Sequence, residues 1–456
     1  MTQVAQRFRQ VWLGWRLIVL LYLVLFPALF RPMVYRIDPV GYYSWARSLL
    51  IDGDLDVRNE FTHYDMAGDV PTTPTGFMHN QWAAGSGLMW LPLMKVMHLA
   101  VSLGSWPGIA ADGYSWPYVW AAAFTSTMAG LGAIVLTYTL ARRLFGNFAA
   151  LLASLVVWLA TPLVYYQYYE PLFAHANDAL LNAFFVLVWW HGRKHGRKPV
   201  WMFGLGLVIG AAIWLRVQNI IMLIIVLLEV GFDLLRDAAR DGWKASARQS
   251  VVRIAPLAGG VALLLVPLLL FWHTVYGAWI LNTYQATGGG VFDLRTPHML
   301  DVLVSTNRGL FVWSPVTLLC LAGVWWLFRA DRRLAIVLSG VFLLQLYIVG
   351  AWSHWAGGAA FGPRFWITMV PYFILGLAAL VHYLDHRIRL PRFGLVLAGG
   401  FLVVWNFLLM LQYATGMVQA VGSIDLTKMV QNQLLVGSRA SQHIMQRLKW
   451  LIDIAK

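Results

Sequence analysis

Charged residues are scarce in this chain. Only 12% of its 456 residues are Asp, Glu, Lys or Arg, whereas 59% are hydrophobic. A water-soluble domain of this length carries about twice that charged fraction, which excludes a soluble globular enzyme. Cysteine is nearly absent too, and the single Cys320 excludes an intrachain disulfide and a cysteine-based metal cluster.

Several motifs of nucleotide and metal chemistry are missing as well. The sequence has neither a Walker motif nor a dinucleotide fingerprint, which argues against ATP-driven transport and against a nucleotide-sugar substrate. It also has no His-Glu-x-x-His pair. The stretch Asp52–Asp56 resembles the start of a calcium loop, but the twelfth position is His63 where such a loop needs Glu. The residues themselves therefore predict no metal site.

Long apolar runs are what the sequence has in abundance. Each is roughly 17 to 25 residues long, the length that a helix needs to cross about 30 Å of hydrocarbon. We therefore predict an all-α polytopic membrane protein with about eleven transmembrane helices. The first run follows three arginines and lacks a small-residue cleavage site, which indicates an uncleaved signal anchor. The predicted spans are Leu17–Val34, Pro117–Ala141, Phe148–Tyr166, Leu172–His191, Val200–Leu215, Ile220–Leu235, Ile254–Val275, Leu310–Phe328, Leu334–Gly350, Trp366–Leu384 and Phe393–Tyr413.

The basic residues indicate how these spans are oriented. If the N-terminus is cytoplasmic, 20 of the 34 Lys and Arg residues fall in the N-terminal segment and in short cytoplasmic connections, as the positive-inside rule requires. Of the 20 acidic residues, 14 then lie on the extracytoplasmic side or close to that side. The formal net charge of +14 is therefore mostly a topology signal, and we expect no nucleic-acid partner. The expected location is the plasma (inner) membrane.

One apolar segment does not fit this count. If Gly85–Leu103 were a span, the basic connections after it would lie outside, so we predict an interfacial or re-entrant helix there. The outer face then has one long first loop, residues 35–116, with amphipathic helices. Residues 1–413 would form the transmembrane catalytic domain, and residues 414–456 an extracytoplasmic tail of amphipathic helices lying on the membrane lipids.

Carboxylates gather in the first loop, where seven occur within 32 residues. Asp38 stands out because it follows the first span directly and precedes Pro39 and a helix-like stretch. One explanation is a helix cap, with Pro at the first helical position. The alternative is that a carboxylate at the membrane surface accepts a proton from an acceptor hydroxyl, as glycosyl transfer from an activated donor requires.

A family resemblance favours the second explanation. The string Asp-Pro-Val-Gly-Tyr-Tyr-Ser-Trp-Ala-Arg-Ser-Leu-Leu from Asp38, followed by Asp52-Gly53-Asp54-Leu55, resembles the start of the first outer loop in GT-C glycosyltransferases. The likeness is greatest to the protein O-mannosyltransferase and aminoarabinose-transferase type. Those relatives often have Asp-Glu where this chain has Asp38-Pro39, so a second acid would come from Glu60 or Asp54. The segments 79–93, 308–315 and 352–365 are similar to further parts of the same group.

The resemblance implies an inverting transfer from a polyprenyl-phosphate sugar, used on the extracytoplasmic side. Asp38 would be the base and Glu60 its support. Arg364, Arg308 and Arg216, each at the outer end of a span, would hold the donor phosphate, because arginine binds phosphate through a bidentate fork. Interfacial snorkelling is the plain alternative for each of these arginines. No cofactor is implied with certainty, and a divalent cation at the acidic loop is left open.

Other polar residues at the outer ends of spans are candidates for lining the substrate site. Ionisable groups that enter a span are costly and tend to face a cavity. These candidates are Asp54, His79, Glu170, His175 and His354. The sugar stays open, and the acceptor could be a glycan, a lipid or a protein. The alternatives are a transporter or flippase without chemistry, a lipid-linked ligase on the same architecture, and a structural assembly factor.

Overall fold

The computed structural model describes residues 3–68, 70–104, 106–437, 445 and 449. Over these residues the chain is helical, and the only extended pairings are two isolated bridges, Thr72 with Met78 and Phe292 with Trp352. The long helices are α1 (Gln3–Leu29), α2 (Ile37–Arg47), α4 (Gly85–Leu103), α5 (Trp116–Phe145), α6 (Asn147–Leu159), α7 (His175–Lys194), α8 (Pro199–Leu215), α9 (Ile220–Asp241), α10 (Trp243–Tyr276), α13 (Val316–Ala330), α14 (Arg332–Ala351), α15 (Val370–Tyr383) and α16 (Arg392–Ala414). The short ones are η1 (Ser48–Asp52), α3 (Arg58–His63), η2 (Tyr165–Tyr169), η3 (Val217–Asn219), α11 (Met299–Val304), α12 (Leu310–Trp313), η4 (Arg364–Met369) and η5 (Leu384–Ile388).

The all-α membrane fold predicted from the apolar runs is confirmed. Each predicted span overlaps a helix, because a run of that length can satisfy its backbone polar groups in lipid only by forming one. The bounds differ in places, since Leu310–Phe328 is divided between α12 and α13, and α6 ends at Leu159, before the predicted end at Tyr166. Among the described residues, seven helical segments are long and apolar enough to cross a membrane. One of them is α4, the segment that we predicted to be interfacial or re-entrant. The number of crossings and the path of α4 remain predictions.

Glycine lets several of these helices approach closely. A Cβ on Gly323 of α13 would lie 1.9 Å from the carbonyl oxygen of Gly376 in α15, and one on Gly206 of α8 would lie 2.2 Å from the carbonyl oxygen of Leu257 in α10. Such backbone contact is the packing that membrane helices use where lipid supplies no hydrophobic driving force. The two crossings help to fix the framework around the polar centre of the protein.

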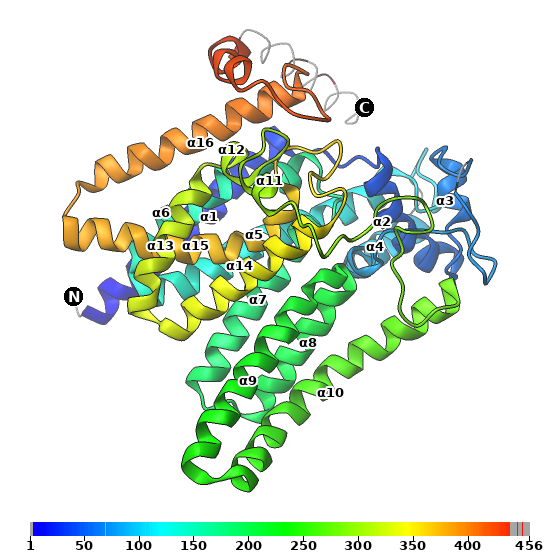
Figure 1. The fold of residues 1–456 in the computed structure, drawn as a ribbon. Helices are drawn as coiled ribbons and strands as arrows, with labels where there is room; N and C mark the ends of the chain where they lie inside the picture. The colour runs from blue at the N-terminus through cyan, green and yellow to red at the C-terminus, as the bar shows by residue number, and fades with distance from the viewer. Residues whose placement is uncertain (1–2, 69, 105, 438–444, 446–448, 450–456) are drawn as a thin grey trace.

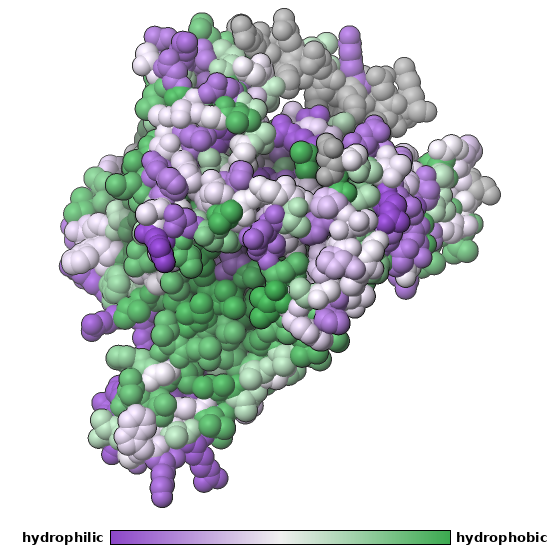
Figure 2. Space-filling model, turned by 45° about the vertical axis from the view of Figure 1, so that its right-hand side comes forward, coloured by the Kyte–Doolittle hydropathy of each residue, from purple (hydrophilic) through white to green (hydrophobic). Residues whose placement is uncertain are grey.

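The outer surface of the bundle is apolar. In Figure 2 a wide hydrophobic zone separates the polar tip of the α9–α10 hairpin from the polar upper part of the molecule. Leucines on these two helices are exposed, among them Leu228 and Leu235 on α9 and Leu263 and Leu270 on α10. An exposed apolar zone of this extent fits a lipid-facing surface and would be unstable in water.

Basic connections gather at one end of the bundle. Arg193, in the last turn of α7, pairs with Asp331 between α13 and α14. Arg197 lies 2.6 Å from Glu229 and 2.5 Å from Asp233 of α9, and Arg333 of α14 lies 2.9 Å from Asp233. These helices run from this end toward the first loop and α2 on the other side of the molecule (Figure 1). The connections after α7 and after α13 therefore lie together beside α9. The orientation of the spans in the membrane stays a prediction.

The C-terminal tail is described only in part. Residues 426–437 are helical, while most of the residues after them lie outside the described part of the chain. The predicted division between a transmembrane domain and an amphipathic tail stays a prediction.

Candidate active site

Asp38 lies in the first turn of α2, and its carboxylate does not cap the helix. The N-cap residue is Arg36, and no side chain caps this end. Instead, Asp38 Oδ1 accepts a hydrogen bond of 3.1 Å from Trp82 Nε1, and Oδ2 pairs with the guanidinium of Arg364. The Asp38 side chain keeps 25% of its surface exposed. The geometry therefore favours a site residue over the capping explanation.

The helix that carries Asp38 is buried on all sides from Pro39 onward. Residues Pro39 to Arg47 are all buried, which is more than an amphipathic pattern predicts, because α4 and the 80–82 segment pack against α2. Asn80 donates 2.8 Å to the carbonyl of Gly41, and Trp45 Nε1 donates 2.8 Å to the carbonyl of Trp82. Trp82 is thereby fixed over Gly41, with its ring N–H toward Asp38.

Glycine is required at position 41, where α2 meets the Trp82 ring. A Cβ there would lie 2.0 to 2.9 Å from atoms of the Trp82 ring, closer than any side chain tolerates. We expect Gly41→Ala to displace Trp82 and weaken its bond to Asp38, with about 1–3 kcal/mol of overpacking destabilisation. The thermal midpoint of the detergent-solubilised protein measures the effect. Gly68→Ala, which has open space around it, is the control, and equal midpoints in the two variants would contradict the packing argument.

Arg364 enters the site from the far end of the sequence. It begins η4. Pro363 precedes it directly, and Gly362 before that has a left-handed backbone conformation. Its guanidinium stacks on Phe173 and Phe365, with centroid distances of 5.3 and 5.4 Å, and its Nε is buried without a described partner. Arg364 therefore keeps donor capacity beyond its bond to Asp38.

A second arginine shares the Phe365 ring. Arg216, at the end of α8, lies 5.0 Å from the Phe365 centroid and 3.1 Å from His175 Nδ1. Its carboxylate partner is the fully buried Asp178 of α7 at 3.9 Å, and Asn219 donates 2.7 Å to the same carboxylate. Arg364 and Arg216 thus approach one aromatic ring from two elements and form a paired cationic site.

A cavity of about 640 Å³ opens between these residues, in the size range of small-molecule sites. Asp38, Trp82, Arg216, His175 and Arg364 line its polar side. Its remaining wall is largely apolar and aromatic. That wall includes Ile220, Phe271, Trp272, Leu281, Tyr284, Phe292, Ile348, Val349 and Trp352.

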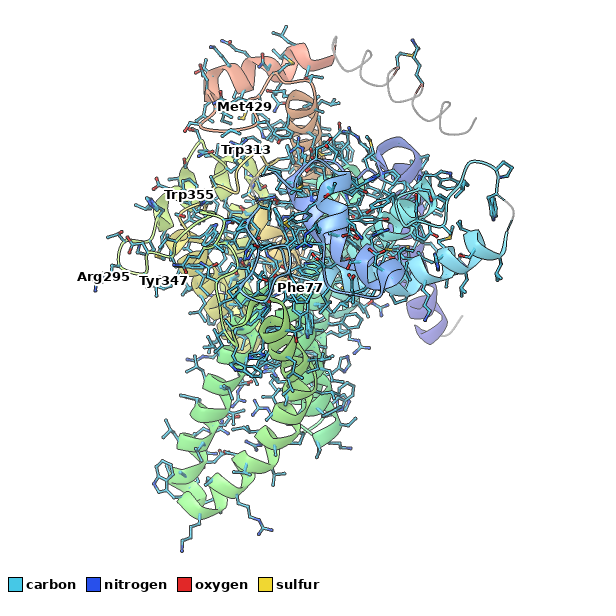
Figure 3. The ribbon with its side chains drawn as sticks, turned by 90° about the vertical axis from the view of Figure 1, so that its right-hand side faces the viewer. Phe77, Arg295, Trp313, Tyr347, Trp355 and Met429 are labelled. Carbon is cyan, nitrogen blue, oxygen red and sulfur yellow. The ribbon has the colours of Figure 1, made fainter. Side chains whose placement is uncertain are left out.

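Two loops close one side of the cavity and are bonded to each other. Ser353 N, in the loop after α14, donates 3.0 Å to the carbonyl of Val291 in the loop after α10. Tyr347 Oη, from α14 itself, donates 2.6 Å to the carbonyl of Leu294 in the loop after α10. Figure 3 shows Tyr347 together with Arg295 and Trp355 at the same edge of the molecule. Trp352 and His354, close in sequence to Trp355, line the cavity together with Asp38.

The structure brings together five of the residues selected from the sequence. Asp38, Arg364, Arg216, His175 and His354 all line the cavity. His79 lies directly behind the wall, since its Nε2 is 2.7 Å from the carbonyl oxygen of the lining residue Thr283.

Two first-loop acids lie elsewhere. Glu60 is fully buried against Arg47 at 3.0 Å and is not among the lining residues, so it does not support Asp38 directly. Asp54 accepts bonds of 2.8 Å from Ser48 Oγ and 3.1 Å from the Asp56 N–H. Both acids stabilise the turn after α2, because a buried or turn-forming carboxylate needs such partners.

Arg308 and Glu170 also stand outside the lining. All five N–H groups of Arg308 are used, four of them on the carbonyls of Ala360, Gln419, Ala420 and Gly422 and the fifth on the Asn307 side chain. No donor remains for a phosphate, so Arg308 holds the 359–363 loop. Glu170 is buried beside Tyr35 and Arg36.

Glu60 makes stability depend on pH. Burial raises the pKa of its carboxyl from 4.5 to about 7, although Arg47 opposes the shift. The folded chain then binds more protons than the unfolded chain between these values, so stability falls as pH rises through that window, by at most about 1.4 kcal/mol per pH unit. We expect the thermal midpoint to decrease from pH 5 to pH 8 and Glu60→Gln to flatten that decrease. If the thermal midpoints of wild type and Glu60→Gln change equally with pH, Glu60 is not the source of the pH dependence.

Sequence reasoning did not select three important residues. Trp82, Tyr284 and Asn219 lie in the site or directly behind it, but each belongs to a residue type that is ordinary at a membrane interface. A usable signal existed only for Trp82, which follows the polar segment from His79 that carries part of the family resemblance.

The surroundings of Asp38 do not suit a divalent cation. Its described partners are an indole N–H and a guanidinium, which are donors and compete with a cation for the carboxylate oxygens. Within the described residues, no group of three or more His, Cys, Asp or Glu side chains could hold a metal ion. We therefore derive no step through a metal.

No protein-family model matches the chain, and no curated protein does. Solved structures do match. ArnT from Cupriavidus metallidurans bound to undecaprenyl phosphate gives a TM-score of 0.51 at 15% identity, over 96% of this chain and 71% of that chain. The same protein in the apo state gives 0.48 at 16% identity, over 90% of this chain and 66% of that chain. An Archaeoglobus fulgidus oligosaccharyltransferase in complex with Zn and sulfate gives 0.50 at 14% identity, over 91% and 54%.

These similarities concern the fold. The chain has the GT-C fold, which confirms the architecture that the Asp38 string implied. It spans about half of the oligosaccharyltransferase and about two thirds of the ArnT chain. At this level of identity, activity, substrates and partners do not transfer from the neighbours.

Proposed function

We propose that the protein is a glycosyltransferase that moves a sugar from a polyprenyl-phosphate donor to a hydroxyl acceptor, with inversion at the anomeric carbon. One observation carries the proposal. A carboxylate and two arginines meet at the polar side of a cavity whose other walls are apolar and aromatic, within a GT-C fold. A lipid phosphate sugar has the matching parts, namely a negative charge, a polar ring and an apolar chain.

Asp38 acts as the base. The acceptor hydroxyl attacks the anomeric carbon, its proton passes to the Asp38 carboxylate, and the bond from the anomeric carbon to the phosphate oxygen breaks. The Trp82 N–H holds Oδ1, so Oδ2, which pairs with Arg364, is the oxygen that takes the proton once that pair opens. Attack from the side opposite to the leaving phosphate inverts the configuration.

Arg364 and Arg216 stabilise the leaving phosphate. The donor phosphodiester carries one negative charge, and the departing polyprenyl phosphate gains a second. Guanidinium groups fixed where that charge develops lower the barrier, because the stabilisation is greater in the transition state than in the donor. A phosphate in the cavity would also compete with Asp38 for Arg364 and so release the carboxylate for catalysis.

The neighbours support the choice of donor. The structure of ArnT that is similar to this chain holds undecaprenyl phosphate. The aromatic wall suits the apolar face of a sugar ring, and the acceptor class stays open. The test is a transfer assay in proteoliposomes with a panel of polyprenyl-phosphate sugars. Absence of transfer from every donor to any glycan, lipid or peptide acceptor would sink the proposal.

The cavity is proposed to open on the extracytoplasmic side of the inner membrane. The basic connections lie at the opposite end of the bundle, and positive connections stay in the cytoplasm. In a variant without Cys320, we expect Arg295→Cys near the cavity to react with an impermeant thiol reagent from outside. Lys244→Cys at the α9–α10 tip should react only after the membrane is opened. The reverse labelling pattern would place the cavity in the cytoplasm.

A further inference from the structure

The turn that leads into α2 is strained. Arg36, two residues before Asp38, has φ 71° and ψ 160°, a backbone region that is nearly restricted to glycine. A residue with a side chain persists there only when its surroundings hold it. The contacts of Arg36 therefore show what fixes the start of the helix that presents Asp38.

Glu170 is the centre of those contacts. Its Oε1 lies 3.2 Å from Arg36 Nε and accepts a 2.9 Å hydrogen bond from Tyr35 Oη. The Glu170 side chain is 1% exposed, and it comes from the loop between η2 and α7. Burial raises the pKa of this carboxyl, while the charge of Arg36 acts in the opposite direction. A buried carboxylate with one arginine partner is a firm anchor, because losing the partner would leave its charge uncompensated.

Arg36 also reaches the loop that carries Arg364. Its Nη1 donates 3.0 Å to the carbonyl of Ala359, and the next carbonyl, Ala360, accepts 3.0 Å from Arg308 Nε. The N–H of Phe361 donates 3.1 Å to Tyr166 Oη. Three successive residues of this loop are thus held just before Gly362, Pro363 and Arg364. The side chain of Arg36 connects the Asp38 segment to the Arg364 segment.

We infer that Glu170 is a positioning residue that acts through Arg36 to set the geometry of the Asp38–Arg364 pair. The inference rests on the proposed function. Glu170 is not among the residues that line the cavity, so its effect passes through the strained turn, the 359–363 loop and its charge interaction with Arg364. The two reacting segments are far apart in the sequence, and this contact ties them together.

The test compares Glu170→Gln with wild type in the transfer assay, with Asp331→Asn, a buried carboxylate paired with Arg193 at the basic end, as the matched control. We expect kcat to fall by about 10- to 100-fold in Glu170→Gln, with KM for the donor changed less than about 3-fold, because misplacement of a reacting group acts on the chemical step. The control should keep wild-type kcat. Wild-type kcat in a folded Glu170→Gln protein would overturn the inference.

A double-mutant cycle separates positioning from general destabilisation. If Glu170 acts through Asp38, adding Glu170→Gln to Asp38→Asn should cost less than about 3-fold further. The same loss in both backgrounds would overturn the inference. If Glu170→Gln does not fold, Arg36→Lys replaces it, since lysine cannot bridge Glu170 and Ala359 as the guanidinium fork does. Full kcat in Arg36→Lys would again contradict the inference.

A second measurement does not depend on activity. Hydrogen exchange of residues 31–45 and 355–365 should speed up together in Glu170→Gln and stay unchanged in Asp331→Asn, because only the first change releases the tie. Unchanged exchange in both segments overturns the inference even if wild type transfers no sugar. Lack of transfer by wild type, in contrast, counts against the proposed function alone.

Discussion

Replacing Asp38 with Asn should lower kcat for sugar transfer by about 10² to 10⁴-fold, the usual contribution of a positioned general base. Asn can still accept the Trp82 hydrogen bond, so the fold around α2 should survive. It cannot take the acceptor proton, and its amide group faces Arg364 where a carboxylate stood. KM for the donor should change little, because the loss falls on the transition state.

Two companion variants make the result specific. Trp82→Phe removes the N–H that fixes Asp38 but keeps a ring over Gly41, so an intermediate loss of kcat is expected. Asp331→Asn should leave kcat unchanged because it alters a carboxylate at the opposite end of the bundle. Full activity of Asp38→Asn would remove the base assignment and leave the GT-C fold untouched.

Replacing Arg364 with Ala should lower kcat/KM for the donor by about 10²- to 10³-fold, the loss seen when one fixed donor to a developing anion is removed. Arg364→Lys should recover only part of this loss, since an ammonium group keeps the charge but not the bidentate fork. Binding of undecaprenyl phosphate, measured by its stabilisation of the protein against heat, should weaken in parallel.

The control for Arg364 is another paired arginine. Arg392 pairs with Asp385 at 3.0 Å beside the start of α16, outside the cavity lining, and Arg392→Ala should retain donor binding. If Arg364→Ala binds undecaprenyl phosphate as wild type does, Arg364 has no phosphate role. Because Arg364 also pairs with Asp38, the two substitutions should be combined, and a non-additive loss is expected.

The sequence predicted the positions of the helices well, because each apolar run long enough to span lipid can only be helical there. It also selected Asp38 and Arg364 individually, since a charge at the end of a span is costly and rare in so apolar a chain. Their pairing could not be predicted, because it depends on how α2 and η4 pack. The local sequence of neither segment contains that information.

The family resemblance selected Glu60 as a second acid, and the position at the end of a span selected Arg308, but the structure places both outside the cavity lining. Both are charges in an apolar chain, yet their partners are protein groups, Arg47 for Glu60 and loop carbonyls for Arg308. Composition shows that a buried charge must have a partner, but not whether the partner is a substrate or the protein itself. The strain at Arg36 has no sequence signal, because it is a property of the backbone angles.

Asp38 and Arg364 are 326 positions apart in the sequence, so they are synthesised at different times. A ribosome that adds about 5 to 20 residues per second needs on the order of half a minute to travel from one to the other. During that interval α2 and Asp38 have already been synthesised, whereas Arg364, the other member of the pair, has not. A growing chain would therefore lack the complete Asp38–Arg364 pair until η4 has been made, and a chain truncated before η4 would lack it altogether.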